Sequence, residues 1–212
     1  MSPDELLTTT RSVRRRLDLH RPVPMELVRE CLEIALQAPT GSNRQNWEWI
    51  VITDPGLRAQ VGDFYRKAVE WYLNSPSAAS KLFADDPRRS AVQRRIGESV
   101  AYLGAHMGDV PVLVIPAIRV GGSGRLPSGN QAGLWGSVLP AAWSYMLAAR
   151  ARGLGTAWTT LHLRYEREIG ELLGLPANVY QAALIPTAYY TGESFRPAAR
   201  EPLDTKLHVN GW

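Results

Sequence analysis

The sequence predicts an α+β fold, and three observations point to it. Residues 24–38 carry apolar side chains at the spacing of an amphipathic helix. Residues 47–53, WEWIVIT, alternate in the manner of a strand, and residues 111–118, PVLVIPAI, form a short apolar run typical of a core strand. Helical and strand patterns mix along the chain without strict alternation, which favours α+β over a parallel α/β sheet.

The first predicted helix begins at Pro24 and ends before Pro39. Proline suits the first helical position, and a later proline disfavours continuation of the helix. The predicted apolar face consists of Leu27, Cys31, Ile34, Ala35 and Ala38. The polar loop PTGSNRQN follows and leads into the strand at 47–53.

A second helix is predicted to follow Asp54, a typical N-cap residue before Pro55. Its apolar positions are Leu57, Val61, Phe64, Ala68 and Tyr72. Residues 75–95 are polar and contain two prolines, so we expect a mobile excursion or lid there. A further helix near 91–107 then leads to the strand at 111–118.

The second half of the chain continues the mixed pattern. A glycine-rich loop at 121–133 precedes residues 134–152, an alanine-rich segment that is apolar all round and predicts a central, buried helix. The stretch GLGTAWTT is expected to be a short connection, and residues 165–176 a short helix that stops at Gly174. Residues 179–192 predict one core strand. Residues 192–212 predict an extended tail that lies on another surface, for which a second copy of the chain would serve.

Composition limits the classes of protein that are possible. The chain has 212 residues, of which 45% are hydrophobic and 21% charged, so we expect a single globular domain over 1–212. The net charge of +4 is weak for a dedicated nucleic-acid-binding protein. No apolar run reaches the roughly 20 residues that cross a bilayer, and no secretory signal is visible, so we expect a cytoplasmic protein without a membrane partner.

Motif searches exclude several chemistries. Cys31 is the single cysteine, and the four histidines are scattered, so no metal site is expected. The chain has no GxxxxGK[ST] loop, no HExxH and no GxSxG. Residues 153–158 are a near match to GxGxxG but lack the third glycine and follow a predicted helix, which disfavours a Rossmann site.

The basic stretch TTTRSVRRRLDLH allows four interpretations: a solvated turn, a nucleic-acid contact, a membrane contact or a site for one phosphate monoester. The nucleic-acid and membrane interpretations lack a recognised module or an amphipathic helix. Arg11, Ser12 and Arg14 offer the paired donors that a phosphate requires. The polar loop Ser42-Asn43-Arg44-Gln45 adds amides that both donate and accept, as a heterocycle edge or a polyol requires.

Four motifs in order resemble the nitroreductase family of FMN-dependent oxidoreductases, over nearly the whole chain. They are the R-S-x-R of residues 11–14, the A-P-T-G-S-N-R-Q-N-W of 38–47, the G-L-G-T-A-W of 153–158 and the closing REPLDTKLHVNGW. The resemblance implies a central mixed or antiparallel sheet flanked by helices, and an intertwined homodimer with two FMN sites at its interface.

The resemblance also implies a set of cofactor contacts. Arg11 and Ser12 would hold the FMN phosphate with help from Arg200, and Arg14 would lie toward the pyrimidine end of the ring. Ser42, Asn43 and Gln45 would contact the ribityl chain and ring polar atoms. A backbone amide near Thr159 or Thr160 would donate to flavin N5. Many members carry a second arginine where this chain has Thr10, so phosphate binding would depend on Arg11 and Arg200.

The activity implied is ping-pong transfer of reducing equivalents from NAD(P)H through FMN to an electron-poor acceptor, such as a nitroaromatic or a quinone. No catalytic side chain is expected, because the flavin carries the chemistry. Two alternatives stay open: specialised flavin chemistry (flavin fragmentation or reductive dehalogenation), and a flavin-binding or storage module without turnover. The aromatic residues of the 64–72 helix form either a substrate wall or core packing; they are Phe64, Tyr65, Trp71 and Tyr72. Trp135 and Trp143 are expected at a dimer seam.

Overall fold

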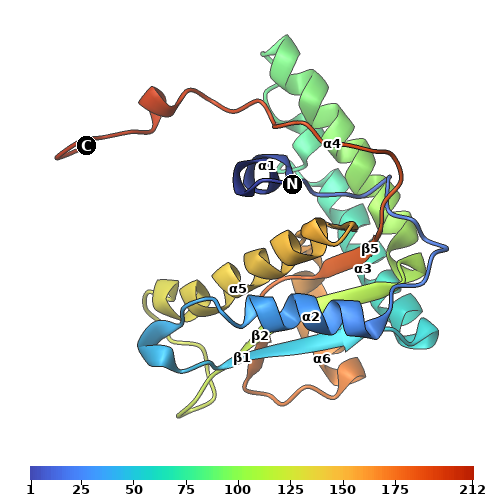
Figure 1. Ribbon diagram of the computed structural model, residues 1–212, viewed down its shortest axis with the longest axis vertical. Coiled ribbons are helices and arrows are strands. Elements are labelled where there is room, and N and C mark those ends of the chain that lie inside the picture. The colour runs from blue at the N-terminus through green and yellow to red at the C-terminus, as the bar shows by residue number, and fades with distance from the viewer.

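An antiparallel sheet runs through the middle of the computed structural model, which describes residues 1–212 (Figure 1). Four strands follow the order β1-β2-β5-β3, and β4 also pairs with β2. Their bounds are β1 Trp47–Ile52, β2 Val112–Arg119, β3 Leu154–Thr156, β4 Val179–Gln181 and β5 Ile185–Tyr189. The predicted α+β fold with a sheet flanked by helices is confirmed.

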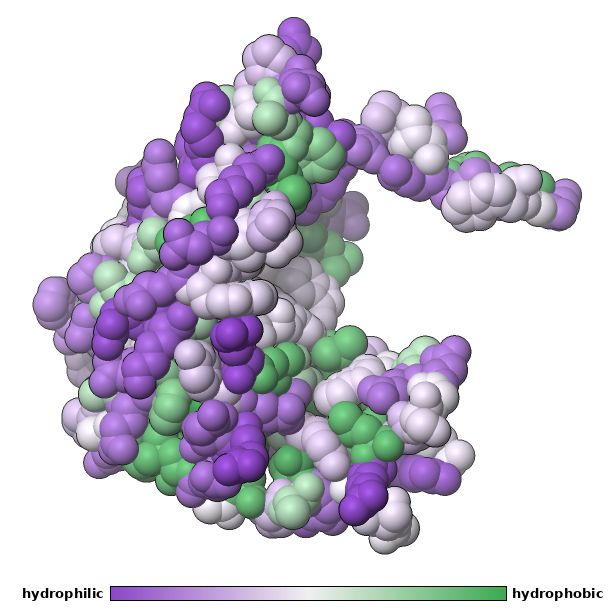
Figure 2. Space-filling model, turned by 180° about the vertical axis from the view of Figure 1, so that it is seen from behind, coloured by the Kyte–Doolittle hydropathy of each residue, from purple (hydrophilic) through white to green (hydrophobic).

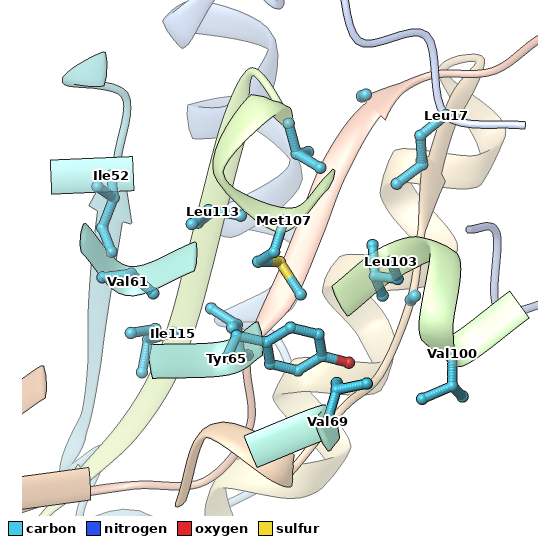
Figure 3. Close-up of a cluster of buried hydrophobic side chains, with 14 of the residues drawn as sticks. Leu17, Ile52, Val61, Tyr65, Val69, Val100, Leu103, Met107, Leu113 and Ile115 are labelled. Carbon is cyan, nitrogen blue, oxygen red and sulfur yellow. The ribbon is translucent and has the colours of Figure 1, made fainter. Parts of the chain in front are cut away.

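Helices cover both faces of this sheet because successive side chains of β2 point to opposite sides. Val112 and Val114 pack with helices α2 (Met25–Ala35) and α5 (Ala132–Ala151). Leu113 and Ile115 pack on the other face with α3 (Pro55–Asn74), α4 (Pro87–His106) and α6 (Glu166–Leu173). Figure 3 shows this second core, in which the Tyr65 ring of α3 lies beside Met107 and Val69. A sheet buried on both faces explains the unbroken apolar run of β2.

Local signals placed several helix ends correctly. The Asp54 carboxylate accepts a hydrogen bond of 2.8 Å from the Leu57 amide at the start of α3, as an N-cap does. Gly174 ends α6 with a φ of +67°, a left-handed conformation that favours glycine. The predicted apolar face of the first helix was partly wrong. Val28, Cys31 and Ala35 are buried, whereas Ile34 is 42% exposed.

Residues 75–95 are more ordered than an irregular excursion. The Asp86 side chain caps the amides of Arg88 and Arg89, and Pro87 occupies the first turn of α4. Proline opens this helix instead of breaking it, because a first-turn residue needs no amide donor. The preceding residues Ala78 and Ala79 are buried. The expected start of this helix was therefore wrong, and a lid function for the segment stays a prediction.

Two other expectations are corrected in the second half of the chain. The stretch expected to be a plain connection contains β3, whose residues 154–156 pair with 187–189 of β5. The single strand expected over 179–192 is split into β4 and β5. Ala117 of β2 pairs with Gln181 of β4, and Val114 of β2 pairs with Ile185 of β5. The chain therefore advances four residues from Gln181 to Ile185 while β2 advances three, so one extra residue is inserted between β4 and β5. This insertion is a β-bulge, and bulges recur beside functional sites.

Both ends of the chain lie outside the two-faced core (Figure 1). A short helix not predicted from the sequence, α1 (Pro3–Thr9), precedes the basic stretch. After Phe195 the chain leaves the body as an extended tail, and Leu203, Val209 and Trp212 are each at least 70% exposed. Figure 2 shows a wide recess between the projecting tail and the rest of the molecule. None of the helices combines the length and apolar composition needed to cross a bilayer.

Candidate functional site

The basic stretch lies along the free edge of the sheet, beside β3. The Val13 amide donates to the Thr156 carbonyl at 2.7 Å, and Ser12 forms a parallel bridge with Thr156. Close approach depends on Gly155, where a Cβ would lie 3.1 Å from the Val13 Cβ and 3.2 Å from that of Tyr190. The structure therefore joins the R-S-x-R and G-L-G-T-A-W motifs, which are separated by about 140 residues of sequence.

Arg14 is a partly buried cation without a carboxylate partner. Its Nη1 lies 3.5 Å from the Ser99 hydroxyl, whereas the neighbouring Arg15 forms an ion pair of 3.2 Å with Glu98. Burial lowers the pKa of Arg14, although nearby Tyr65 and Tyr72 oppose that shift. A guanidinium that is partly desolvated and unneutralised favours an anion or a strong hydrogen-bond acceptor.

The segment after β3 leaves the Thr160 amide free. Thr159 donates its amide to the Leu184 carbonyl at 3.1 Å and accepts from the Leu184 amide at 2.8 Å. The Thr159 hydroxyl also lies 3.1 Å from the buried Tyr65 hydroxyl. The Thr160 amide has no acceptor and its residue is exposed. Of the two candidate donors to a flavin, Thr160 is therefore the one whose amide is available, because that of Thr159 is used in the bridge at the β-bulge.

The phosphate-binding candidates are only partly assembled within one chain. Arg11 lies on the same edge and donates from Nη1 to the Arg196 carbonyl at 3.4 Å. Arg200 lies on the exposed tail, and its single hydrogen bond goes to the neighbouring Ala199 carbonyl. One chain thus leaves both Arg11 and Arg200 without a carboxylate partner.

The polar turn at 41–45 has an unusual backbone. Ser42, Asn43 and Gln45 adopt φ values of +54°, +51° and +50°, a region that few residues other than glycine enter. The Gln45 side chain donates to the Asn43 Oδ1 at 3.0 Å, and the turn is held by a bond of 3.1 Å from the Gly41 amide to the Ser137 hydroxyl. This shape presents the amide side chains to solvent, where a ligand could meet them.

Within one chain the polar turn and the basic stretch do not meet. The turn contacts Ser137 in the first half of α5, whereas Ser12 pairs with Thr156, just after the C-terminal end of that helix. From Ser137 to Ala151 the helix rises by roughly 21 Å. Figure 1 shows the two segments at opposite ends of α5. Arg11, Ser12 and Arg14 therefore lie at one end, and Ser42, Asn43 and Gln45 lie at the other. Thr160 lies against the first half of α5, beside Trp135 and Leu139.

A cluster that the sequence did not reveal holds the start of the tail. Arg16 donates to the carbonyls of Thr191 and Ser194, and its guanidinium carbon lies 4.2 Å from the centre of the Phe195 ring. The guanidinium of Arg150, which is 7% exposed, lies 4.7 Å from the same ring and donates to the Tyr190 hydroxyl. Two cations thus stack on one aromatic ring. No sequence signal marked this anchor.

A cavity of about 280 Å³ opens next to Thr160. Its apolar wall is provided by α5, by the segment after β3 and by the loop before α5, and its polar end by α6 and β4. The lining residues are Leu126, Trp135, Leu139, Trp158, Thr160, Leu163, Glu166, Gln181 and Ala182. Trp135, which we had expected at a dimer seam, is part of this wall. No group of three or more His, Cys, Asp or Glu side chains is placed to hold a metal ion.

Comparison with known proteins matches most of the chain. A family model described as the Nitroreductase family matches residues 7–189. The iodotyrosine deiodinase 1 of Rattus norvegicus is 24% identical over 206 residues, which cover 94% of this chain and 66% of that protein. The chain therefore spans just under two thirds of the length of this relative. The NADH dehydrogenase of Thermus thermophilus is 29% identical over 210 residues, which cover 92% of this chain and 89% of that protein.

A solved structure confirms the fold. An oxidised iodotyrosine deiodinase bound to FMN and 3-iodo-L-tyrosine superposes with a TM-score of 0.73 and covers 99% of both chains. The two sequences are 19% identical, so this likeness describes the arrangement of the backbone.

Proposed function

This chain belongs to the nitroreductase family, and we propose that it is an FMN-dependent oxidoreductase whose two flavin sites form between two copies of the chain. The observation that carries the proposal is the docking of the R-S-x-R segment on β3 with Arg14 partly buried and unneutralised. Such a cation is costly in the free protein and is stabilised by an electron-rich ligand. The residues therefore fit a phosphate-bearing heterocyclic cofactor.

The need for a second copy follows from the separation along α5. The polar turn supplies Ser42, Asn43 and Gln45 at one end of the helix, and the basic stretch lies at the other. An antiparallel arrangement of two α5 helices about a twofold axis would bring the turn of one chain to the basic stretch of its partner. Trp143, an apolar residue of α5 that is 38% exposed, would be covered in such a dimer. The apolar tail residues would be covered in the same way.

Each site residue then has a definite task. Arg11, Ser12 and Arg200 would neutralise and orient the phosphate through charge-assisted hydrogen bonds. Arg14 would place positive charge at the pyrimidine end of the ring, and the Thr160 amide would donate at N5. FMN supplies hydride and electron transfer when it is bound, so no catalytic acid or base is required of the chain. Alignment by these contacts is the contribution of the protein to the rate.

We further propose NAD(P)H as the electron donor, with ping-pong transfer to a nitroaromatic, quinone or similar acceptor. The name of the Thermus relative supports a nicotinamide donor. The test is the absorbance of the purified protein, where bands near roughly 370 and 450 nm should bleach on addition of NADH or NADPH without air. Colourless protein that does not bind added FMN would refute the proposal. FMN binding without any oxidation of NAD(P)H would favour a storage module instead.

A second candidate is reductive dehalogenation of an aromatic compound. It is supported by the similarity to iodotyrosine deiodinase along 94% of this chain. Halide release distinguishes the two candidates. Protein whose flavin is reduced by dithionite, and not by NAD(P)H, should release iodide from an iodophenol if the second candidate holds. Rapid NAD(P)H oxidation with a quinone and no halide release supports the first.

A further inference from the structure

We propose that the cavity beside Thr160 binds a flat aromatic compound of one or two rings that carries N–H donors or a positive charge. Most ligand pockets measure roughly 300–1,000 Å³, so a cavity of about 280 Å³ suits a small ring system. Its apolar wall contains two indoles, Trp135 and Trp158, whose faces favour aromatic rings and cations.

The polar end of this cavity offers acceptors and no positive charge. The Glu166 Oε1 accepts from the Gln181 amide at 2.8 Å, which fixes the carboxylate in place. The Gln181 side chain is 2% exposed, and its Nε2 donates to the Glu166 carbonyl at 2.8 Å. Its Oε1 is buried without a donor. A buried acceptor without a partner is costly. This end of the cavity is therefore rich in acceptors, and a ligand N–H would meet the Glu166 carboxylate there.

The two arginines nearest to Glu166 in the sequence are engaged away from the cavity. The Arg164 guanidinium carbon lies 4.1 Å from the centre of the Trp71 ring, and Arg167 forms an ion pair of 3.0 Å with Glu171. His162 is fully buried, and burial lowers its pKa to about 3, so it is neutral. A carboxylate substrate would therefore meet Glu166 without compensation, whereas an amine, amidine or ring cation would be attracted to it.

Because Thr160 lines the cavity and also offers the free amide of the flavin site, the compound would lie beside the cofactor. This placement rests on the proposed function. The binding preference itself rests only on the cavity. We infer that the substrates of this protein are neutral or cationic nitrogen-bearing aromatics, and that acidic aromatics are disfavoured.

Calorimetric titration of the FMN-loaded protein tests the inference with three probes of the same size: 1-methylquinolinium, quinoline and 2-naphthoate. The cation should bind at least tenfold more tightly than the anion. Glu166→Gln, which keeps an acceptor for the Gln181 amide, should remove this preference while leaving quinoline unchanged. Glu168→Gln, an exposed change in the same helical turn, should leave the preference intact.

A salt titration of the unaltered protein gives a second readout that needs no variant. Raising the ionic strength should weaken binding of the cation and leave quinoline unaffected. Equal or tighter binding of 2-naphthoate would overturn the inference, as would a cation preference that survives Glu166→Gln. Normal FMN uptake with no binding of any probe would also overturn it and would leave the proposed function standing.

Discussion

Replacing Arg14 with methionine should have opposite effects on the empty and the flavin-loaded protein. In the empty protein this guanidinium is partly buried, has no ion pair and makes one long contact of 3.5 Å with Ser99. Methionine keeps most of the apolar stem and removes the charge that burial penalises. We therefore expect the empty variant to be as stable as the parent, or more stable by about 1 kcal/mol.

The flavin-loaded protein should lose affinity. A hydrogen bond to a charged group contributes roughly 1.5–3 kcal/mol, which corresponds to a loss of about tenfold to a hundredfold in FMN affinity. Fluorescence titration of the flavin gives the affinity, and thermal unfolding of the empty protein gives the stability. The expected signature is weaker FMN binding with an unchanged or higher melting temperature.

Arg15→Met is the matched control for this prediction. Arg15 is the next residue, is exposed and pairs with Glu98 on the surface, where an ion pair contributes little. It should leave both quantities nearly unchanged. Arg16 is not a suitable control, since it holds the tail through Thr191 and Ser194. A clear loss of melting temperature in the empty Arg14 variant, with unchanged FMN affinity, would show that Arg14 has a structural role.

Three further predictions concern stability and the tail. The pKa of His162 in the folded state is about 3, below its ordinary value of 6.5. The unfolded state therefore binds a proton on this histidine before the folded state does as the pH falls. The free energy of unfolding should then drop below pH 6.5, by at most about 1.4 kcal/mol per pH unit from this group. Denaturant titrations of His162→Leu should show a shallower pH dependence than those of the parent. Phe195→Ala should remove about 1–2 kcal/mol of cation–π interaction with the two arginines. Limited proteolysis should then cut the tail of this variant faster than that of the parent, whereas Phe195→Tyr should be cut at the rate of the parent. Gly62→Ala should lower the melting temperature, because a Cβ there would lie 2.6 Å from the Gly108 amide nitrogen. The expected loss of stability is roughly 1–3 kcal/mol. Gly133→Ala should leave the melting temperature unchanged, because a Cβ there meets open space.

Much of the fold could be predicted because its signals are local. The N-cap at Asp54, the stop at Gly174 and the alternation of residues 47–52 each depend on a few neighbouring residues. The errors arose where distant contacts decide. The strand over 179–192 is split because its middle must also pair with Thr159. Similarly, β3 forms only because β5 and the basic stretch lie on either side of it.

The candidate site was predictable to the extent that its motifs are short and ordered along the chain. The parts that were missed are formed by packing between elements. The anchor of the tail joins the basic stretch, the end of α5 and the residues after β5. The cavity joins α5, α6 and β4 around two tryptophans. Single residues such as Arg150 or Glu166 carry no signature of these contacts in the sequence.

Complementation between two defective chains tests the central claim most directly. Arg11→Ala damages the basic end of the site, and Asn43→Ala damages the polar turn at the other end of α5. Each variant alone should bind FMN poorly. When the two are co-expressed, half of the dimers should be mixed, and each mixed dimer should contain one intact site, so that about a quarter of all sites should bind FMN. Recovery of flavin in the mixed protein is the predicted result. If the mixture binds no more FMN than the separate variants, the site is contained within one chain and the account is wrong.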